Sequence, residues 1–112
     1  MYQLIVKGHF DSAHHLPGHP TCGTPHGHTF RVETRVSGKS LQPNMMLVDF
    51  QDVKGTWKKY DHRDLNAFFE YPTAENIART IFEELDKIPS IDVEYVKVWE
   101  SPDACCEVTA DD

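Results

Sequence analysis

Apolar and polar residues alternate along three segments of the chain, residues 2–11, 28–37 and 92–100. Because successive side chains of a strand point to opposite faces, this alternation predicts strands with one buried and one solvated face. Two shorter runs, 45–48 and 105–109, predict a third strand and a last strand. The glycines and prolines of residues 12–25 predict a loop between the first two strands.

Two segments between these strands repeat apolar residues at helical spacing instead. Asp49 stands at the N-cap position of the first, and Thr73 stands at the N-cap position of the second. The first predicts a helix of about three turns, with apolar positions at Phe50, Val53, Trp57 and Tyr60. The second is the clearest stripe in the chain, and comprises Ala74, Ile77, Ala78, Ile81, Phe82 and Leu85. Pro89 is expected to end this helix. The order predicts an α+β fold, an antiparallel sheet of four or five strands with two helices packed on one face.

The composition narrows the class of protein. With 112 residues, 39% of them hydrophobic, residues 1–112 are expected to form a single domain, and subunit association would add stability to a chain of this size. The formal net charge of −7 argues against nucleic acid or an anionic membrane as partner. Three cysteines form a poor disulfide framework, and the longest aliphatic run, residues 45–48, is too short for a membrane span. We therefore expect a cytoplasmic protein.

Three histidines are candidate metal ligands. His26 and His28 flank one glycine at the start of an alternating run, so a strand there puts both imidazoles on one face. His14 ends the preceding run, and antiparallel pairing would bring it to the same place. Three histidines around zinc leave a position open for water or substrate, where the metal acts as a Lewis acid.

Two other interpretations of these histidines remain open. His26 and His28 are alternatively a surface pair flanking a turn glycine. Cys22, four residues before His26, is alternatively a fourth ligand that closes a structural site. We favour the open site because the chain also carries groups that a structural zinc does not need.

Those groups are a thiol, an imidazole beside a carboxylate, and a further carboxylate. Cys22 lies in a loop rich in glycine and proline, where a nearby cation would lower its pKa and favour the thiolate. Asp61 and His62 are adjacent, as in a proton shuttle, although such pairs in loops are more often solvated. Glu100 shares a strand face with Val96 and Val98 and suits a ligand edge with two parallel N–H groups. A surface glutamate is the simpler alternative there.

These residues fall within a set of motifs. They are Phe10-x-x-Ala13-His14, Cys22-x-x-x-His26-Gly27-His28, Val48-Asp49-Phe50, Asp61-His62-x-x-Leu65-Asn66, Pro72-Thr73-x-Glu75-Asn76 and Glu100. Their order and spacing resemble those of the 6-pyruvoyltetrahydropterin synthase family over nearly the whole chain. The three-residue gap between Cys22 and His26 resembles the 6-carboxytetrahydropterin synthase branch, which serves queuosine and other 7-deazapurine biosynthesis.

The resemblance implies the tunnelling fold, in which the sheets of several subunits join into a barrel, commonly as trimers that stack into hexamers. It implies that His14, His26 and His28 hold catalytic zinc. It also implies a carbon–carbon lyase that converts 7,8-dihydroneopterin triphosphate to 6-carboxy-5,6,7,8-tetrahydropterin, acetaldehyde and triphosphate.

By the same resemblance, Cys22 and His62, oriented by Asp61, would move protons. Glu100, with Thr73, would anchor the amino edge of the pterin, in a site that is shared between subunits. Two alternatives are the pyruvoyl branch, which eliminates triphosphate and keeps the side-chain carbons, and a non-catalytic zinc-stabilised binding module.

Overall fold

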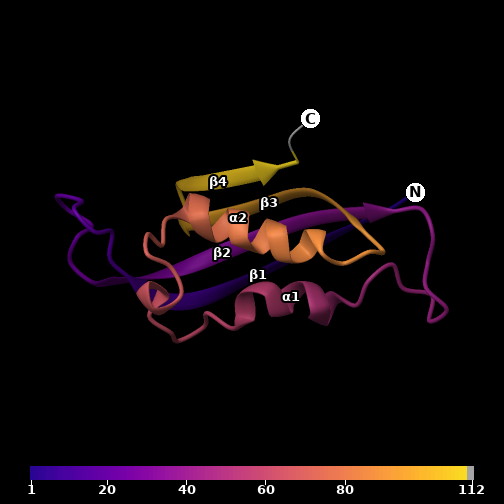
Figure 1. Cartoon of the computed structure of the whole chain (residues 1–112), viewed down its shortest axis with the longest axis horizontal. Helices are drawn as coiled ribbons and strands as arrows, with labels where there is room; N and C mark the ends of the chain where they lie inside the picture. The colour runs from indigo at the N-terminus through magenta and orange to yellow at the C-terminus, as the bar shows by residue number, and fades with distance from the viewer. Residues whose placement is uncertain (111–112) are drawn as a thin grey trace.

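Two long strands form the framework of the sheet. In the computed structural model, which describes residues 1–110, β1 (Tyr2–His14) and β2 (His26–Gly38) pair antiparallel along their whole length. β3 (Asp92–Ser101) pairs with β2, and β4 (Ala104–Thr109) pairs with β3, both antiparallel. The order across the sheet is β1-β2-β3-β4, which leaves β1 and β4 at its edges (Figure 1).

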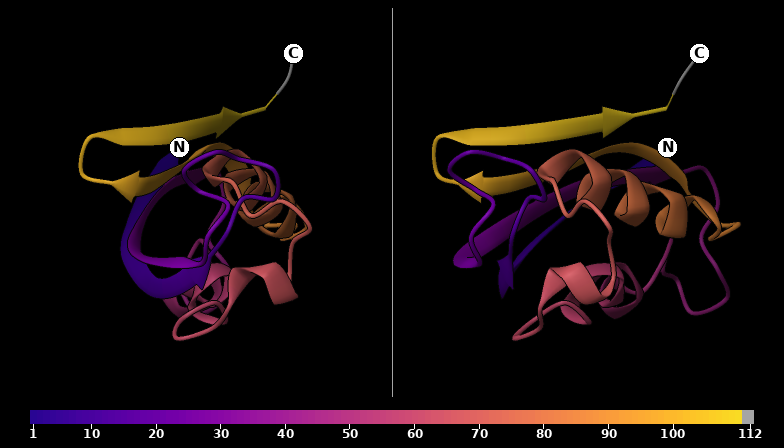
Figure 2. Two further views of the ribbon diagram at one scale, coloured as in Figure 1. Left: turned by 90° about the vertical axis from the view of Figure 1, so that its left-hand side faces the viewer. Right: turned by 60° about the vertical axis from the view of Figure 1, so that its left-hand side comes forward.

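Both helices begin where the sequence predicts an N-cap. The carboxylate of Asp49 accepts a hydrogen bond from the N–H of Gln51 at the start of α1 (Phe50–Lys58), and the hydroxyl of Thr73 accepts one from the N–H of Asn76 at the start of α2 (Ala74–Asp86). A single 3-10 turn, Leu65–Ala67, lies between them. The two helices lie on the same side of the curved sheet (Figure 2), as predicted. None of these helices is long and apolar enough to cross a membrane.

The core lies between the sheet and the helices. On the sheet side it contains Val6, Phe10, Phe30, Val32, Val36, Val96 and Val98, and on the helix side Val53, Trp57, Ile77, Ala78, Ile81 and Leu85. Phe10 and Phe30 are register partners, and their rings stack with centroids 5.0 Å apart. The alternating and helical patterns of the sequence therefore identify the buried faces correctly.

The structure corrects the predicted elements in three places. Residues 45–48 do not form a strand, because Met45 has a positive φ of 67° in a turn while Leu47 and Val48 pack into the core. The loop between the first two strands is shorter than residues 12–25, since β1 continues to His14 and β2 begins at His26. α2 ends at Asp86, before Pro89. Among residues 1–110 the sheet therefore has four strands, the lower of the two predicted numbers.

The close approach of Trp57 to Gly8 shows how tightly α1 packs on β1, and substitution of Gly8 tests this packing. A Cβ at Gly8 would lie 2.7 Å from Nε1 of Trp57, whose ring is buried, whereas a Cβ at Gly55, inside α1, would meet nothing within 4 Å. We expect Gly8→Ala to lower the free energy of unfolding by about 1–3 kcal/mol through overpacking. We expect the control Gly55→Ala to raise it by about 0.5–1 kcal/mol, since alanine is the better helix former. Urea unfolding of both variants checks this, and equal stabilities would contradict the packing described.

Candidate metal centre and active site

Three histidines converge at one end of the sheet. The register of β1 and β2 places His14 opposite His26, and His28 follows two residues later on the same face. The centroids of the three rings lie 4.6 Å (His14–His26), 5.0 Å (His14–His28) and 4.7 Å (His26–His28) apart. Strand pairing thus brings together the three imidazoles that the sequence identified as candidate ligands.

Backbone carbonyls orient two of these rings. Nδ1 of His14 lies 2.9 Å from the carbonyl oxygen of Pro72, and Nδ1 of His26 lies 2.7 Å from that of Thr24. Because a carbonyl oxygen only accepts, each Nδ1 carries the proton and donates it, which leaves the Nε2 lone pair free. A metal-bound histidine usually donates a hydrogen bond of this kind from the ring nitrogen that does not bind the metal, and the bond fixes the orientation of the ring.

Two of the Nε2 atoms have no partner in the described part of the chain. Nε2 of His14 and Nε2 of His28 are buried and make no hydrogen bond. Burial lowers the pKa of His28, as do His14 and His26 nearby, while Glu100 acts in the opposite direction. A buried, neutral imidazole with an unused lone pair is costly unless a cation binds it. The cluster therefore fits a divalent metal ion.

Glu100 completes this group from the end of β3. Its Oε1 lies 3.0 Å from Nε2 of His28 and 3.3 Å from Nε2 of His14. These contacts are not hydrogen bonds, so the carboxylate faces two ring nitrogens that have no hydrogen-bond partner in the described chain. One ligand atom from each of the three histidines and Glu100 lies within 4.8 Å of the others. A divalent cation at this position would be attracted by both the carboxylate and the unpartnered ring nitrogens.

Cys22 is not part of this four-residue group. It lies half-buried in the loop 15–25, where its N–H donates to Nδ1 of His19 at 2.9 Å and its carbonyl accepts from Leu16 at 2.7 Å. Its thiol approaches only the hydroxyl of Thr21, at 3.8 Å, among the hydrogen bonds of residues 1–110. In the described chain it is Glu100, not Cys22, that accompanies the three imidazoles.

Asp61 and His62 are held on the outer edge of β1. Oδ1 of Asp61 accepts from the N–H of Asp11 at 2.9 Å, and the N–H of His62 donates to the carbonyl of Asp11 at 2.7 Å. Oδ2 of Asp61 lies 3.0 Å from Nδ1 of His62. The hydrogen bond from Asp11 is the main cause that lowers the pKa of Asp61, so this carboxylate stays ionised and holds the imidazole. Both side chains are exposed.

A hollow of about 320 Å³ adjoins Glu100 at the start of α2. It is lined by Ala74, Glu75, Glu100, Ala104, Cys105 and Cys106. Thr73 caps the helix next to it, and the carbonyl of Pro72 supports His14, so the hollow and the histidine cluster share one segment of chain. Cys105 is exposed and Cys106 half-buried at this hollow, which the sequence alone did not indicate. The carbonyls of Pro72 and Thr24 were also missed, since backbone acceptors leave no signal in the sequence.

The sequence profile of the 6-pyruvoyl tetrahydropterin synthase family matches residues 3–111. The chain belongs to this family. A protein of Archaeoglobus fulgidus, provisionally named a 6-carboxy-5,6,7,8-tetrahydropterin synthase, is 43% identical over 107 residues, which cover 92% of this chain and 91% of the relative. A Haemophilus influenzae protein named 6-carboxy-5,6,7,8-tetrahydropterin synthase is 32% identical, covering 96% of this chain and 98% of its own.

Two further comparisons concern activity and fold. A Pyrococcus furiosus protein named dihydroneopterin monophosphate aldolase is 35% identical, over 88% of this chain and 89% of its own. The structure of Caenorhabditis elegans 6-pyruvoyl tetrahydropterin synthase superposes with a TM-score of 0.78 at 23% identity, covering 98% of this chain and 96% of that one. The family and the fold predicted from the motifs are therefore confirmed, and the family is one of pterin-processing lyases.

The histidine cluster makes a direct prediction about metal content. We expect His28→Ala to lose the bound divalent ion, because its buried Nε2 is one of the unpartnered ligand atoms. His9→Ala is the matched control, since His9 belongs to the same sheet but is exposed and lies outside the cluster. Mass spectrometry of the metal in purified, metal-loaded protein checks this. Equal metal content in the two variants would contradict the assigned site.

Proposed function

We propose that this chain is a zinc-dependent 6-carboxytetrahydropterin synthase of the cytoplasm, which acts in queuosine or other 7-deazapurine biosynthesis. With one molecule of water, it converts 7,8-dihydroneopterin triphosphate to 6-carboxy-5,6,7,8-tetrahydropterin, acetaldehyde and triphosphate. The observation that carries the proposal is the group of three imidazoles and Glu100, beside a hollow at the start of α2. The names of two relatives, one of them provisional, support the same activity.

His14, His26 and His28 would hold the zinc ion. Three neutral imidazoles are a common donor set for catalytic zinc, and they leave a coordination position for substrate. Zinc bound there supplies Lewis-acid polarisation of the oxygens on the pterin side chain. The chain itself fixes the orientation of the donors, through the carbonyls behind His14 and His26.

The pterin would occupy the hollow beside Glu100. A carboxylate accepts two parallel N–H groups in a bidentate manner, which matches the amino edge of a pterin. Thr73 fixes the start of α2 at the rim through its capping hydrogen bond. Because Glu100 also faces His14 and His28, a ring bound to this carboxylate would lie close to the zinc ligands.

Cys22 and His62 would move protons on the substrate side chain. The thiol of Cys22 lies in a loop at the histidine end of the sheet and is not committed to the metal group. Asp61 accepts from Nδ1 of His62 and so directs Nε2 of that ring outward as the reactive nitrogen. Since this pair is exposed on the edge of β1, it is available to a neighbouring copy. That exposure supports a homo-oligomer, a trimer or hexamer, with active sites shared between subunits.

A second candidate function follows from the name of another relative. The Pyrococcus furiosus relative is named as an aldolase for dihydroneopterin monophosphate, and its identity to this chain is similar to that of the named synthase from Haemophilus influenzae. Such an enzyme would break a side-chain carbon–carbon bond but release the two-carbon aldehyde with its phosphate still attached. The pyruvoyl reaction would instead release triphosphate and retain all side-chain carbons.

Product analysis distinguishes these reactions. We expect the zinc-loaded protein to release acetaldehyde and triphosphate in equal amounts from dihydroneopterin triphosphate. Triphosphate without acetaldehyde would indicate the pyruvoyl reaction. Cleavage confined to the monophosphate, giving a phosphorylated aldehyde, would indicate the aldolase. The absence of any product from a folded, metal-loaded oligomer would leave the non-catalytic binding module as the remaining interpretation.

The role of Cys22 is tested by Cys22→Ala. Since Cys22 lies outside the metal group, we expect the variant to keep its metal and its assembly, while kcat falls by about 10²–10⁴-fold through the loss of a proton-transfer group. Ser40→Ala is the control and is expected to retain both metal and activity, because Ser40 is exposed and lies outside both the metal group and the hollow beside Glu100. Metal content, size-exclusion chromatography and steady-state kinetics are measured together. Loss of the metal in Cys22→Ala would instead identify Cys22 as a ligand.

A further inference from the structure

The face of the sheet that points away from the helices carries an ordered row of paired charges. Lys7, Glu33, Lys97 and Glu107 follow one another across the four strands as register partners. Lys7 lies 3.7 Å from Glu33, and Lys97 lies 3.6 Å from Glu107. The second carboxylate oxygen of Glu33 accepts from the hydroxyl of Tyr95 at 2.5 Å. This row, which we call the charge ladder, therefore neutralises itself.

The adjacent row on the same face contains a guanidinium without an ion-pair partner among the described residues. It consists of His9, Arg31 and Trp99, which are also register partners, and we call it the Arg31 row. Among residues 1–110 no carboxylate lies within 4.0 Å of the Arg31 guanidinium, although the chain has 18 acidic residues against 11 basic ones. Asp11, the next acid along β1, accepts from the hydroxyl of Thr29 at 2.5 Å. Arg31 thus makes no ion pair within the described chain, although Asp11 lies on the same face.

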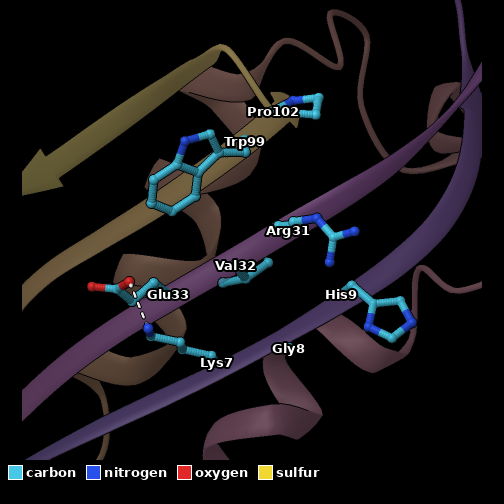
Figure 3. Close-up of a pocket in the computed structure, with 8 residues that line it drawn as sticks. All are labelled: Lys7, Gly8, His9, Arg31, Val32, Glu33, Trp99 and Pro102. Carbon is cyan, nitrogen blue, oxygen red and sulfur yellow. Dashed lines mark ion pairs between the residues drawn. The ribbon is translucent and has the colours of Figure 1, made fainter.

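A hollow of about 480 Å³ lies over these two rows. Its lining is Lys7, Gly8, His9, Arg31, Val32, Glu33, Trp99 and Pro102. Figure 3 shows the indole of Trp99 on one side of Val32, with Arg31 and His9 on the other side and the Lys7–Glu33 pair closing the end. The hollow combines a half-buried aromatic ring, a pyrrolidine ring and an unpaired guanidinium.

We propose that this hollow binds a phosphorylated heteroaromatic anion. The ring of the ligand packs on Trp99, and its phosphate is bound by Arg31 and His9. A guanidinium presents parallel N–H donors that match phosphate oxygens, and an indole offers a flat apolar surface for stacking. The charge ladder does not compete for Arg31, because both oxygens of Glu33 are engaged. The site lies on the face opposite the histidine cluster and does not depend on the proposed function.

GTP is a suitable probe, because it joins a fused heteroaromatic ring to a triphosphate. We expect calorimetry to detect binding of GTP to the native protein, and weaker binding of guanosine and of inorganic triphosphate, each of which supplies only half of the contacts. Quenching of Trp fluorescence should accompany binding, since Trp99 is accessible while Trp57 is 1% exposed. Inorganic triphosphate that binds as tightly as GTP would overturn the role of the ring.

Arg31→Gln is the decisive variant. We expect it to weaken GTP binding by at least about tenfold, the usual loss for a charge-assisted hydrogen bond. Arg79→Gln, which removes an exposed guanidinium from α2, should bind GTP like the native protein. Equal affinity in the two variants would overturn the proposal. Turnover should be retained in Arg31→Gln, and its loss together with GTP binding would overturn the claim of a separate site. If the native protein does not turn over the pterin substrate, the proposed function is wrong. The GTP-binding test can still be carried out and interpreted.

Discussion

The register between β1 and β2 is the constraint on which the rest of the structure depends. The two strands pair along 13 residues each, from Tyr2 opposite Gly38 to His14 opposite His26. A slip by one residue would turn every side chain of one strand to the other face. It would separate the stacked rings of Phe10 and Phe30 and, at the same time, send His14 away from its two companions. Packing of the core thus enforces the geometry of the candidate metal centre.

β1 also joins the separate parts of the candidate active site. Its last residue belongs to the histidine cluster, and the backbone of Asp11 holds Asp61 and His62 on the outer edge. The inner face of this strand therefore carries a candidate metal ligand, while its edge presents Asp61 and His62 to solvent. A single rigid element carries groups that the proposed chemistry needs in two different directions, which is consistent with sites completed between copies.

Much of this arrangement was predictable from the sequence, for identifiable physical reasons. Alternation located the buried faces of three strands, and the side chains of Asp49 and Thr73 marked the helix starts because few other residues cap so well. The spacing of His26 and His28 placed them on one face. By contrast, the aliphatic run 45–48 was wrongly predicted as a strand, since burial of Leu47 and Val48 against the core produces the same hydrophobic signal. The approach of Glu100 to His28, and the docking of Asp61 on β1, depend on contacts between distant segments that local patterns do not encode.

The hydrogen bond from His14 to the carbonyl of Pro72 connects the histidine cluster with the start of α2. Pro72 immediately precedes the residue that caps α2, and the first residue of that helix borders the hollow beside Glu100. An ion bound to His14 would therefore also restrain the start of α2, and a molecule bound against α2 would restrain the imidazole of His14. Thermodynamic linkage makes such an effect mutual, so each occupant changes the dissociation constant of the other by the same factor. The hydrogen bond between His14 and Pro72 would thereby allow the ion and the organic ligand to bind cooperatively.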